Sequence, residues 1–296
     1  MLQLTLGPLL FNWAPDKIRD FYFKIADESP IDVVFLGEVV CSKRFVFQSE
    51  YFNAVLERLI SAKKQIIFSS LALVMDDNEC KSIRDLADMA NEYLIEANDV
   101  SLIDLLAGRS HAIGPYINTY NAGTLAYFES QGACRFSLPG ELSSESIASI
   151  TKGVKKAITE VQVFGRLPLA ISARCYHARF YNKTKDTCQF VCDKDHDGKT
   201  VNTIKGESFL VINGTQTLSY TYVNLISEID KLKEMGVKSF RLSPHDCDMV
   251  FVSNIFRQVM DESITQEQGL GQLKAALPLY QFSNGFFHQK PGCDWV

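Results

Sequence analysis

Short apolar runs alternate with amphipathic segments along most of this chain, and this alternation limits its fold more than any other feature. Residues 31–37, IDVVFLG, are almost continuously apolar, as in strands that are buried on both faces. Just before them, Pro15 suits the first turn of a helix, and Ile18, Phe21 and Ile25 recur at helical spacing. Strands that alternate with helices predict βαβ units around a parallel sheet.

The number of repeats favours a barrel. Six further runs are strand-like: residues 1–15, 65–70, 111–118, 133–140, 161–165 and 237–244. Helical spacing predicts a helix from Ile83 to Leu94, a helix capped by Ser143, and one that ends at Gly236. Seven or eight repeats in 296 residues predict an α/β fold, a TIM-like (β/α) barrel that is complete or lacks a strand. A doubly wound open sheet is the alternative, but neither G-x-G-x-x-G nor G-x-x-x-x-G-K-[ST] supports it.

One segment departs from this rhythm. From about residue 181 to 219 the chain becomes polar, and Asn213-Gly214 then lies between two apolar runs, which is a strong hairpin signal. We therefore expect a single barrel-like domain over residues 1–296, with an antiparallel hairpin insertion at about 181–219, after the seventh or so strand.

Charge and hydropathy exclude some partners. The net charge is −5 and no Lys/Arg-rich run is present, so nucleic acid is not an expected partner. No apolar stretch is long enough to predict a transmembrane segment. The first 15 residues lack the positive start and small-residue cleavage site of a signal peptide, which predicts a cytoplasmic protein. Thiols stay reduced there, so the eight cysteines are expected to be free thiols or metal ligands.

Three cysteines gather at the entrance of the predicted insertion. Cys175, Cys188 and Cys192 follow the spacing C-x12-C-x3-C. Zinc takes four ligands from Cys and His, and His196 would make a third ligand beside Cys188 and Cys192. An iron–sulfur cluster takes four thiolates, of which this segment supplies three. A third interpretation is a set of unligated thiols in a polar loop.

Barrel geometry nominates the fourth ligand. Cys41 follows the run at 31–37 and Cys175 follows the run that starts at 161, so both thiols are expected at the carboxyl ends of barrel strands. That face carries the active sites of such barrels. Cys41 is therefore the preferred partner, although 133 residues separate it from Cys175. Cys247, which also follows a strand-like run, is the alternative. The sequence assigns no role to the remaining cysteines, Cys80, Cys134 and Cys293.

Peptidase motifs are absent. The chain contains no H-E-x-x-H, no H-x-x-E-H and no G-x-S-x-G. His177, His196, His245 and His288 could combine with carboxylates only in space, and satisfied or solvent-facing side chains are expected for all four. Basic residues beside the cysteines would offset the charge of a bound cluster, or lie on the solvated surface: Lys43, Arg44 and Arg174.

Several segments resemble the collagenase-like peptidase U-32 superfamily, and within it the branch that supports oxygen-independent ubiquinone biosynthesis. These are LGEVVCSKRF, VFGRLPLAISARCYHAR, the C-x12-C-x3-C spacing and SNGFFHQKPG, and the resemblance covers essentially the whole chain. It implies a 4Fe-4S cluster whose iron is bound by Cys41, Cys175, Cys188 and Cys192.

The resemblance also implies partners. These are a UbiU-like homologue in a heterodimer, a lipid-binding UbiT-like protein, a ubiquinone precursor to be hydroxylated, and prephenate as the oxygen donor. A dicarboxylate donor predicts a cationic pocket, for which arginines near strand ends are candidates: Arg166, Arg174, Arg179 and Arg241. No catalytic residue is assigned. A zinc-binding peptidase-like protein and a noncatalytic scaffold for a catalytic homologue are the alternative functions.

Overall fold

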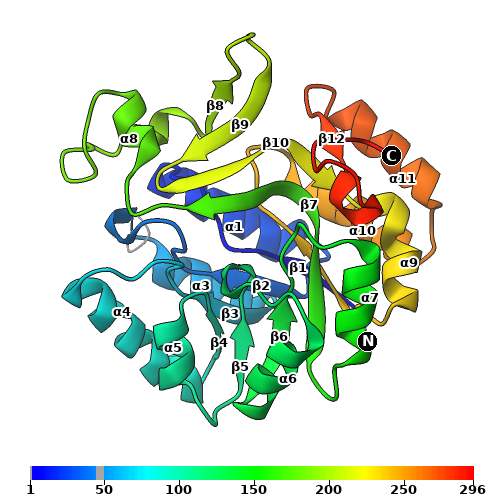
Figure 1. The fold of residues 1–296 in the computed structure, drawn as a ribbon, viewed down its shortest axis with the longest axis horizontal. Helices are drawn as coiled ribbons and strands as arrows, with labels where there is room; N and C mark the ends of the chain where they lie inside the picture. Colours follow the sequence, from blue (N-terminus) through cyan, green and yellow to red (C-terminus); the bar gives the residue numbers. More distant parts are fainter. Residues whose placement is uncertain (1, 45–49) are drawn as a thin grey trace.

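Eight parallel strands form a closed barrel in the computed structural model, which describes residues 2–44 and 50–296 (Figure 1). Neighbouring strands pair in parallel, and β11 pairs with both β1 and β7, which closes the ring. The predicted TIM-like α/β fold is therefore confirmed, and no strand of the barrel is lacking. The barrel strands are β1 (Gln3–Leu6), β2 (Val33–Leu36), β3 (Gln65–Ser69), β4 (Leu94–Ala97), β5 (His111–Ile113), β6 (Ala133–Ser137), β7 (Ile158–Ile171) and β11 (Ser239–Leu242).

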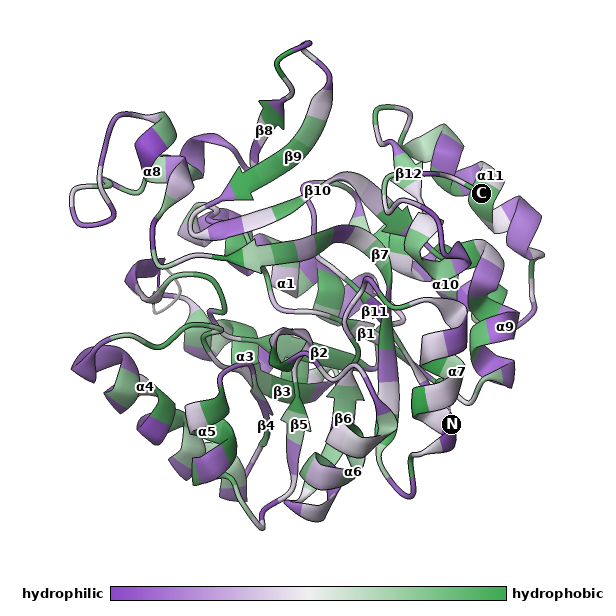
Figure 2. Ribbon diagram, in the orientation of Figure 1, coloured by the Kyte–Doolittle hydropathy of each residue, from purple (hydrophilic) through white to green (hydrophobic). Residues whose placement is uncertain are grey.

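Helices surround the barrel and present apolar stripes to it. The strands are mostly hydrophobic, whereas the helices alternate hydrophobic and hydrophilic stripes (Figure 2). Leu59 of α3 and Phe256 of α10 are completely buried in the layer between helices and strands. The helices are α1 (Pro15–Glu28), α3 (Phe52–Ser61), α4 (Asp77–Asp88), α5 (Val100–Leu105), α6 (Ala122–Ser130), α7 (Ser144–Lys152), α8 (Tyr176–Phe180), α9 (Ile229–Glu234), α10 (Met249–Met260) and α11 (Gln266–Ala276).

Local signals in the sequence set several helix ends. Pro15 begins α1, and the Ser143 side chain accepts the Ser146 N–H to cap α7. Gly236 follows the last residues of α9 with φ +92°, a conformation that favours glycine. The helix expected from Ile83 to Leu94 is wrong at its C-terminal end, because α4 ends at Asp88 and Leu94 begins β4. Leu94 matches the helical spacing only by coincidence, since the strand pairs it with Ile67 of β3.

The strand β7 is long and belongs to two sheets. Its first half pairs in parallel with β6 and β11, and its second half pairs antiparallel with β10. Gly165 lies at the junction with φ +110°, where a Cβ atom would stand 2.7 Å from the imidazole Nε2 of His245. A side chain at this position would therefore push the seventh strand away from the loop after the eighth.

The chain leaves the barrel after β7 and returns at β11. In between, β8 (Lys199–Asn202), β9 (Ser208–Asn213) and β10 (Gln216–Asn224) extend the sheet in antiparallel order, and α8 lies beside them (Figure 1). The short strand β12 (Phe282–Ser283) pairs with β10. The hairpin expected at Asn213-Gly214 joins β9 to β10, with Gly214 at φ +65° in the turn.

The barrel interior contains charged side chains where bulky aliphatic residues are usual. Glu160 accepts hydrogen bonds from Arg135 at 2.8 Å and Arg241 at 2.6 Å, and Arg241 also pairs with Glu96. All four side chains are at most 5% exposed. Burial would raise the pKa of Glu160, but charge from Arg241 and Arg135 outweighs it and holds that pKa below its ordinary value, so Glu160 is ionised at neutral pH.

Candidate functional site

Cys41 lies in the loop that follows β2, at the carboxyl end of the barrel. The carboxylate of Glu38 accepts the backbone N–H groups of Val40 and Cys41, each at 2.8 Å. Glu38 is 1% exposed, and burial raises its pKa. These bonds turn the loop sharply after the strand and fix the position of the Cys41 backbone.

The other three predicted ligands lie in the segment that follows β7. Cys175 caps α8, and its Sγ accepts the N–H of Ala178 at 3.3 Å. Cys192 lies in a single 3₁₀ turn at Val191–Lys194, and Cys188 precedes that turn. Between the two, Gln189 and Phe190 both adopt positive φ, at +48° and +52°. Such backbone strain is costly outside glycine and is found more often at functional sites.

All four predicted cysteines line one small, mainly apolar cavity. Gly214 of the hairpin tip and Ala178 of α8 complete part of its wall. All four thiols are free, and Cys175 is the most buried at 9% exposure. Burial raises the pKa of both Cys41 and Cys175. The structure thus brings together thiols that lie in two distant parts of the chain.

Four thiols around one cavity are the donor set of a 4Fe-4S cluster, and zinc also takes four Cys or His ligands. Zinc bonds its sulfur ligands at about 2.3 Å, which requires them all to converge on one point. Within residues 2–44 and 50–296, no three or more His, Cys, Asp or Glu side chains are placed to ligate one metal ion. A 4Fe-4S cluster would be held by the four thiolates, one on each iron. His196, the candidate zinc ligand, instead contacts Lys17 and Asp246.

Cationic side chains border the cysteine cavity. Lys43 and Arg44, which follow Cys41, both line it, and the Lys43 ammonium donates to the Lys185 carbonyl at 2.7 Å. Lys185 lines the cavity as well and was missed from the sequence, because it lies 10 residues from Cys175 in a polar loop. Arg174 is exposed and does not line the cavity. Three basic residues therefore border the cavity, where they would offset the negative charge of metal-bound thiolates.

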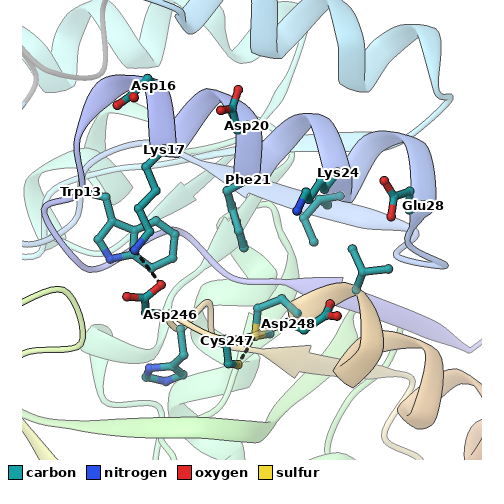
Figure 3. A pocket seen from close by; sticks show the side chains of 14 residues that line it. Trp13, Asp16, Lys17, Asp20, Phe21, Lys24, Glu28, Asp246, Cys247 and Asp248 are labelled. Carbon is teal, nitrogen blue, oxygen red and sulfur yellow. Dashed lines mark hydrogen bonds and ion pairs between the residues drawn. The ribbon is translucent and has the colours of Figure 1, made fainter. Parts of the chain in front are cut away.

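Cys247, the alternative fourth ligand, lies in a different cavity. It lines a groove of about 580 Å³ between α1 and the loop that follows β11 (Figure 3). In this groove Lys17 pairs with Asp246 at 2.6 Å and stacks on Trp13. Burial, the main cause, raises the pKa of Cys247 to about 12. Its place in this groove separates Cys247 from the cysteine cavity.

Each of the four histidines considered from the sequence lies within hydrogen-bond distance of a carboxylate. The pairs are His177–Asp195, His196–Asp246, His245–Asp197 and His288–Glu228. His245 is completely buried, and its Nε2 accepts the backbone N–H of Arg166 at 2.9 Å. Its Nδ1 therefore carries the proton and donates it to Asp197 at 2.6 Å. With both nitrogens occupied, His245 is a structural residue and not a general base.

Asp197 connects the barrel to the extension, the part of the chain that comprises α8 and β8–β10. Besides His245 of the eighth βα loop, it accepts the hydroxyl of Tyr222 and lies 3.7 Å from the Arg166 guanidinium. Against the opposing effect of burial, these groups hold the pKa of Asp197 well below its ordinary range. The cysteine-bearing segment is thereby tied to the barrel through one ionised carboxylate.

Asp197→Asn is expected to loosen the extension. The amide keeps the size of the side chain but loses hydrogen bonds to a charged group, which are worth about 1.5–3 kcal/mol. Limited proteolysis should cleave the segment from 183 to 206 about tenfold faster or more. Because the folded-state pKa is lowered, this stabilisation is present above about pH 3.9 and is lost as the pH falls further. Asp27→Asn, at a surface carboxylate that is 39% exposed and pairs with Arg58 instead of this segment, is the control and should leave the cleavage rate unchanged.

The arginines considered for a dicarboxylate pocket do not gather. Arg241 is paired with Glu96 and Glu160 inside the barrel, and Arg166 is bound to Asp197, Tyr222 and backbone carbonyls. Arg174 and Arg179 are exposed. The buried acids Glu38, Glu96 and Glu160 were not singled out from the sequence, where a single acid inside an apolar run such as LIEA was the only signal.

No helix in the described residues is long and apolar enough to cross a membrane, in agreement with the sequence.

Three comparisons with known proteins bear on the fold and the family. Residues 17–296 match the model of peptidase family U32. One relative, named tRNA hydroxylation protein P2 from Bacillus subtilis (strain 168), is 29% identical over 132 residues. That match covers 41% of this chain and 40% of the relative.

Two solved structures are distantly similar to this chain. N-acetylneuraminate lyase from Mycoplasma synoviae has a TM-score of 0.48 at 8% identity, over 93% of this chain and 79% of that one. The spore cortex-lytic enzyme SleL from Bacillus megaterium QM B1551 has a TM-score of 0.37 at 9% identity, over 82% and 71% of the two chains. Neither likeness bears on function. The family match extends over nearly the whole length, so this chain belongs to peptidase family U32.

Proposed function

We propose that this chain is a UbiV-like iron–sulfur subunit of an oxygen-independent hydroxylase complex that acts on ubiquinone precursors. One observation carries the proposal: Cys41 and the C-x12-C-x3-C segment, separate in sequence, line a single cavity. The thiolates of Cys41, Cys175, Cys188 and Cys192 would hold a 4Fe-4S cluster there. The residues from about 181 to 219 would then form an insertion that carries part of the site.

Two further points support a hydroxylase and not a peptidase. A family relative is named as a hydroxylation protein, although the match covers only part of both chains. His177, His196, His245 and His288 each contact a different carboxylate, and the sequence contains no zinc peptidase motif. These observations make the zinc-binding peptidase-like alternative less favourable.

The chain's own residues would hold and shield the cluster. A bound 4Fe-4S cluster supplies one-electron transfer, and with four cysteine ligands it has no open iron position. Glu38 fixes the loop of Cys41, the Ala178 N–H donates to Cys175, and Lys43, Arg44 and Lys185 offset negative charge. The four arginines considered for a dicarboxylate do not gather into one pocket, so we place the binding of prephenate in a UbiU-like partner of a heterodimer. A lipid-binding UbiT-like protein would present the ubiquinone precursor.

A second candidate function is the hydroxylation of RNA, which the name of the relative suggests. The charge of this chain speaks against it, because the net charge is −5 and there is no basic run. The noncatalytic-scaffold alternative requires that a folded chain without a cluster still supports the reaction. The ubiquinone, RNA and scaffold functions can be separated in one set of strains.

Complementation without oxygen tests the proposal. In a bacterium that lacks its own UbiV-like gene, the chain should restore ubiquinone formation under anaerobic growth, and Cys175→Ala should not. Ubiquinone is measured by mass spectrometry of lipid extracts, and nucleosides from tRNA are measured in the same cells. Restoration of a hydroxylated tRNA nucleoside in place of ubiquinone would contradict the substrate. Full ubiquinone formation with folded Cys175→Ala would establish the scaffold function instead.

A further inference from the structure

Arg44 is a buried cation beside the cysteine cavity. Its side chain is 2% exposed, and Nη1 donates to the Leu10 carbonyl at 2.7 Å. Nη2 donates to Oδ1 of Asn213 at 2.8 Å, while the Asn213 amide donates to the same Leu10 carbonyl at 2.6 Å. The guanidinium is therefore held between the loop after β1 and the tip of the β9–β10 hairpin. Its orientation is fixed before any ligand binds.

One donor of this guanidinium has no partner. Nε is completely buried and makes no hydrogen bond to any residue that the structure describes. A buried N–H without an acceptor is costly, which indicates that an acceptor is missing from the surroundings. Besides Glu38, the Cys192 and Cys41 thiols are close enough to act on the charge of Arg44, and Cys192 lies within its hydrogen-bonding reach. Arg44 itself lines the cavity that the four cysteines share.

The backbone leaves no spare space around the guanidinium. A Cβ atom on Gly214, at the hairpin tip, would stand 2.6 Å from Nη2 of Arg44. The carboxylate of Glu38 lies 3.9 Å away on the other side, too far for a hydrogen bond. Arg44 thus contacts the hairpin tip of the extension and belongs to the loop of Cys41, which are the two parts of the chain that supply the thiols.

We propose that Arg44 donates its Nε–H to a sulfur of the bound cluster or of a ligating cysteine, and thereby raises the reduction potential of the cluster. The inference rests on the proposed function. One-electron reduction adds one negative charge to the site without a proton or a leaving group, and a fixed positive charge with a directed N–H favours the more negative state. Arg44 is a positioning residue in this account, because it acts on the cluster through sulfur.

The test is a redox titration of anaerobically purified protein with dithionite, followed by electron paramagnetic resonance. Arg44→Gln removes the charge and the Nε–H, and we expect the ratio of reduced to oxidised cluster at a fixed potential to fall about tenfold. That change corresponds to about 59 mV for a one-electron couple. Arg44→Lys keeps the charge without the directed donor and should give a smaller fall. Arg174→Gln, which removes an exposed cation next to Cys175 that does not line the cavity, is the matched control and should change the ratio far less.

Gly214→Ala is a fourth variant, needed in case Arg44→Gln does not fold. Gly214→Ala keeps Arg44 but displaces its guanidinium, so it should lower the ratio in the same direction, with iron content as in the wild type. If Arg44→Gln loses its iron, the titrations of Arg44→Lys and Gly214→Ala decide. Unchanged potentials in cluster-loaded Arg44 variants would refute the role of Arg44 and leave the cluster assignment intact. A wild-type protein without iron and sulfide would refute the proposed function itself.

Discussion

Cys175→Ala is expected to reduce bound iron and acid-labile sulfide to near zero in protein purified without oxygen. Cys175 is the most buried of the four thiols and caps α8, so no other donor can replace it without moving the helix. Three remaining thiolates leave one iron of a 4Fe-4S cluster without its protein ligand. The measurement is colorimetric iron and sulfide, with visible absorption as a second readout.

Cys247→Ala is the matched control for this loss. Cys247 is also partly buried and also follows a barrel strand, but it lines the groove beside α1 and not the cysteine cavity. We expect its iron content to equal that of the wild type. Unfolding profiles of both variants show whether either has lost its fold. The ligand assignment is wrong if folded Cys175→Ala keeps its iron while Cys247→Ala loses it.

Arg241→Met is expected to destabilise the fold by about 3–5 kcal/mol, the typical cost of removing one partner from a buried ion pair. Arg241 contacts two carboxylates inside the barrel, and it is the only cation within salt-bridge distance of Glu96 among the described residues. Its guanidinium also stacks on Phe35, 4.0 Å from the ring centroid. Methionine fills most of the volume but leaves Glu96 as an unpaired charge at 1% exposure.

Urea unfolding followed by circular dichroism measures the effect, as a lower midpoint at an unchanged slope. Arg58→Met is the control, because its ion pair with Asp27 lies on the surface with side chains 52% and 39% exposed. Surface pairs contribute about 0–1 kcal/mol, so this variant should unfold close to the wild type. Equal losses for both arginines would mean that the network inside the barrel does not stabilise the fold.

Features that depend on local periodicity could be predicted from the sequence. The run at 31–37 became β2, and Pro15 and Ser143 begin helices as expected. Parallel strands of a barrel share one carboxyl end, and for this reason Cys41 could be nominated as the partner of Cys175 across 133 residues. That step needed the fold class alone and no side-chain detail.

Features that depend on tertiary partners could not be predicted. Leu94 fits a helix by spacing and a strand by pairing, and only the neighbouring β3 decides between them. The acids Glu96 and Glu160 reveal their role only when the closed barrel places Arg241 against both. Arg166 looked available for a substrate because its bonds to Asp197 and Tyr222 cross from one part of the fold to another.

The most direct test of the central claim is the metal and sulfide content of the wild-type chain, purified without oxygen together with a UbiU-like partner. We expect about four iron and four sulfide for this chain, one iron for each cysteine ligand. The partner purified alone gives the amount to subtract. Stoichiometric zinc, with no sulfide above that of the partner, would contradict the account.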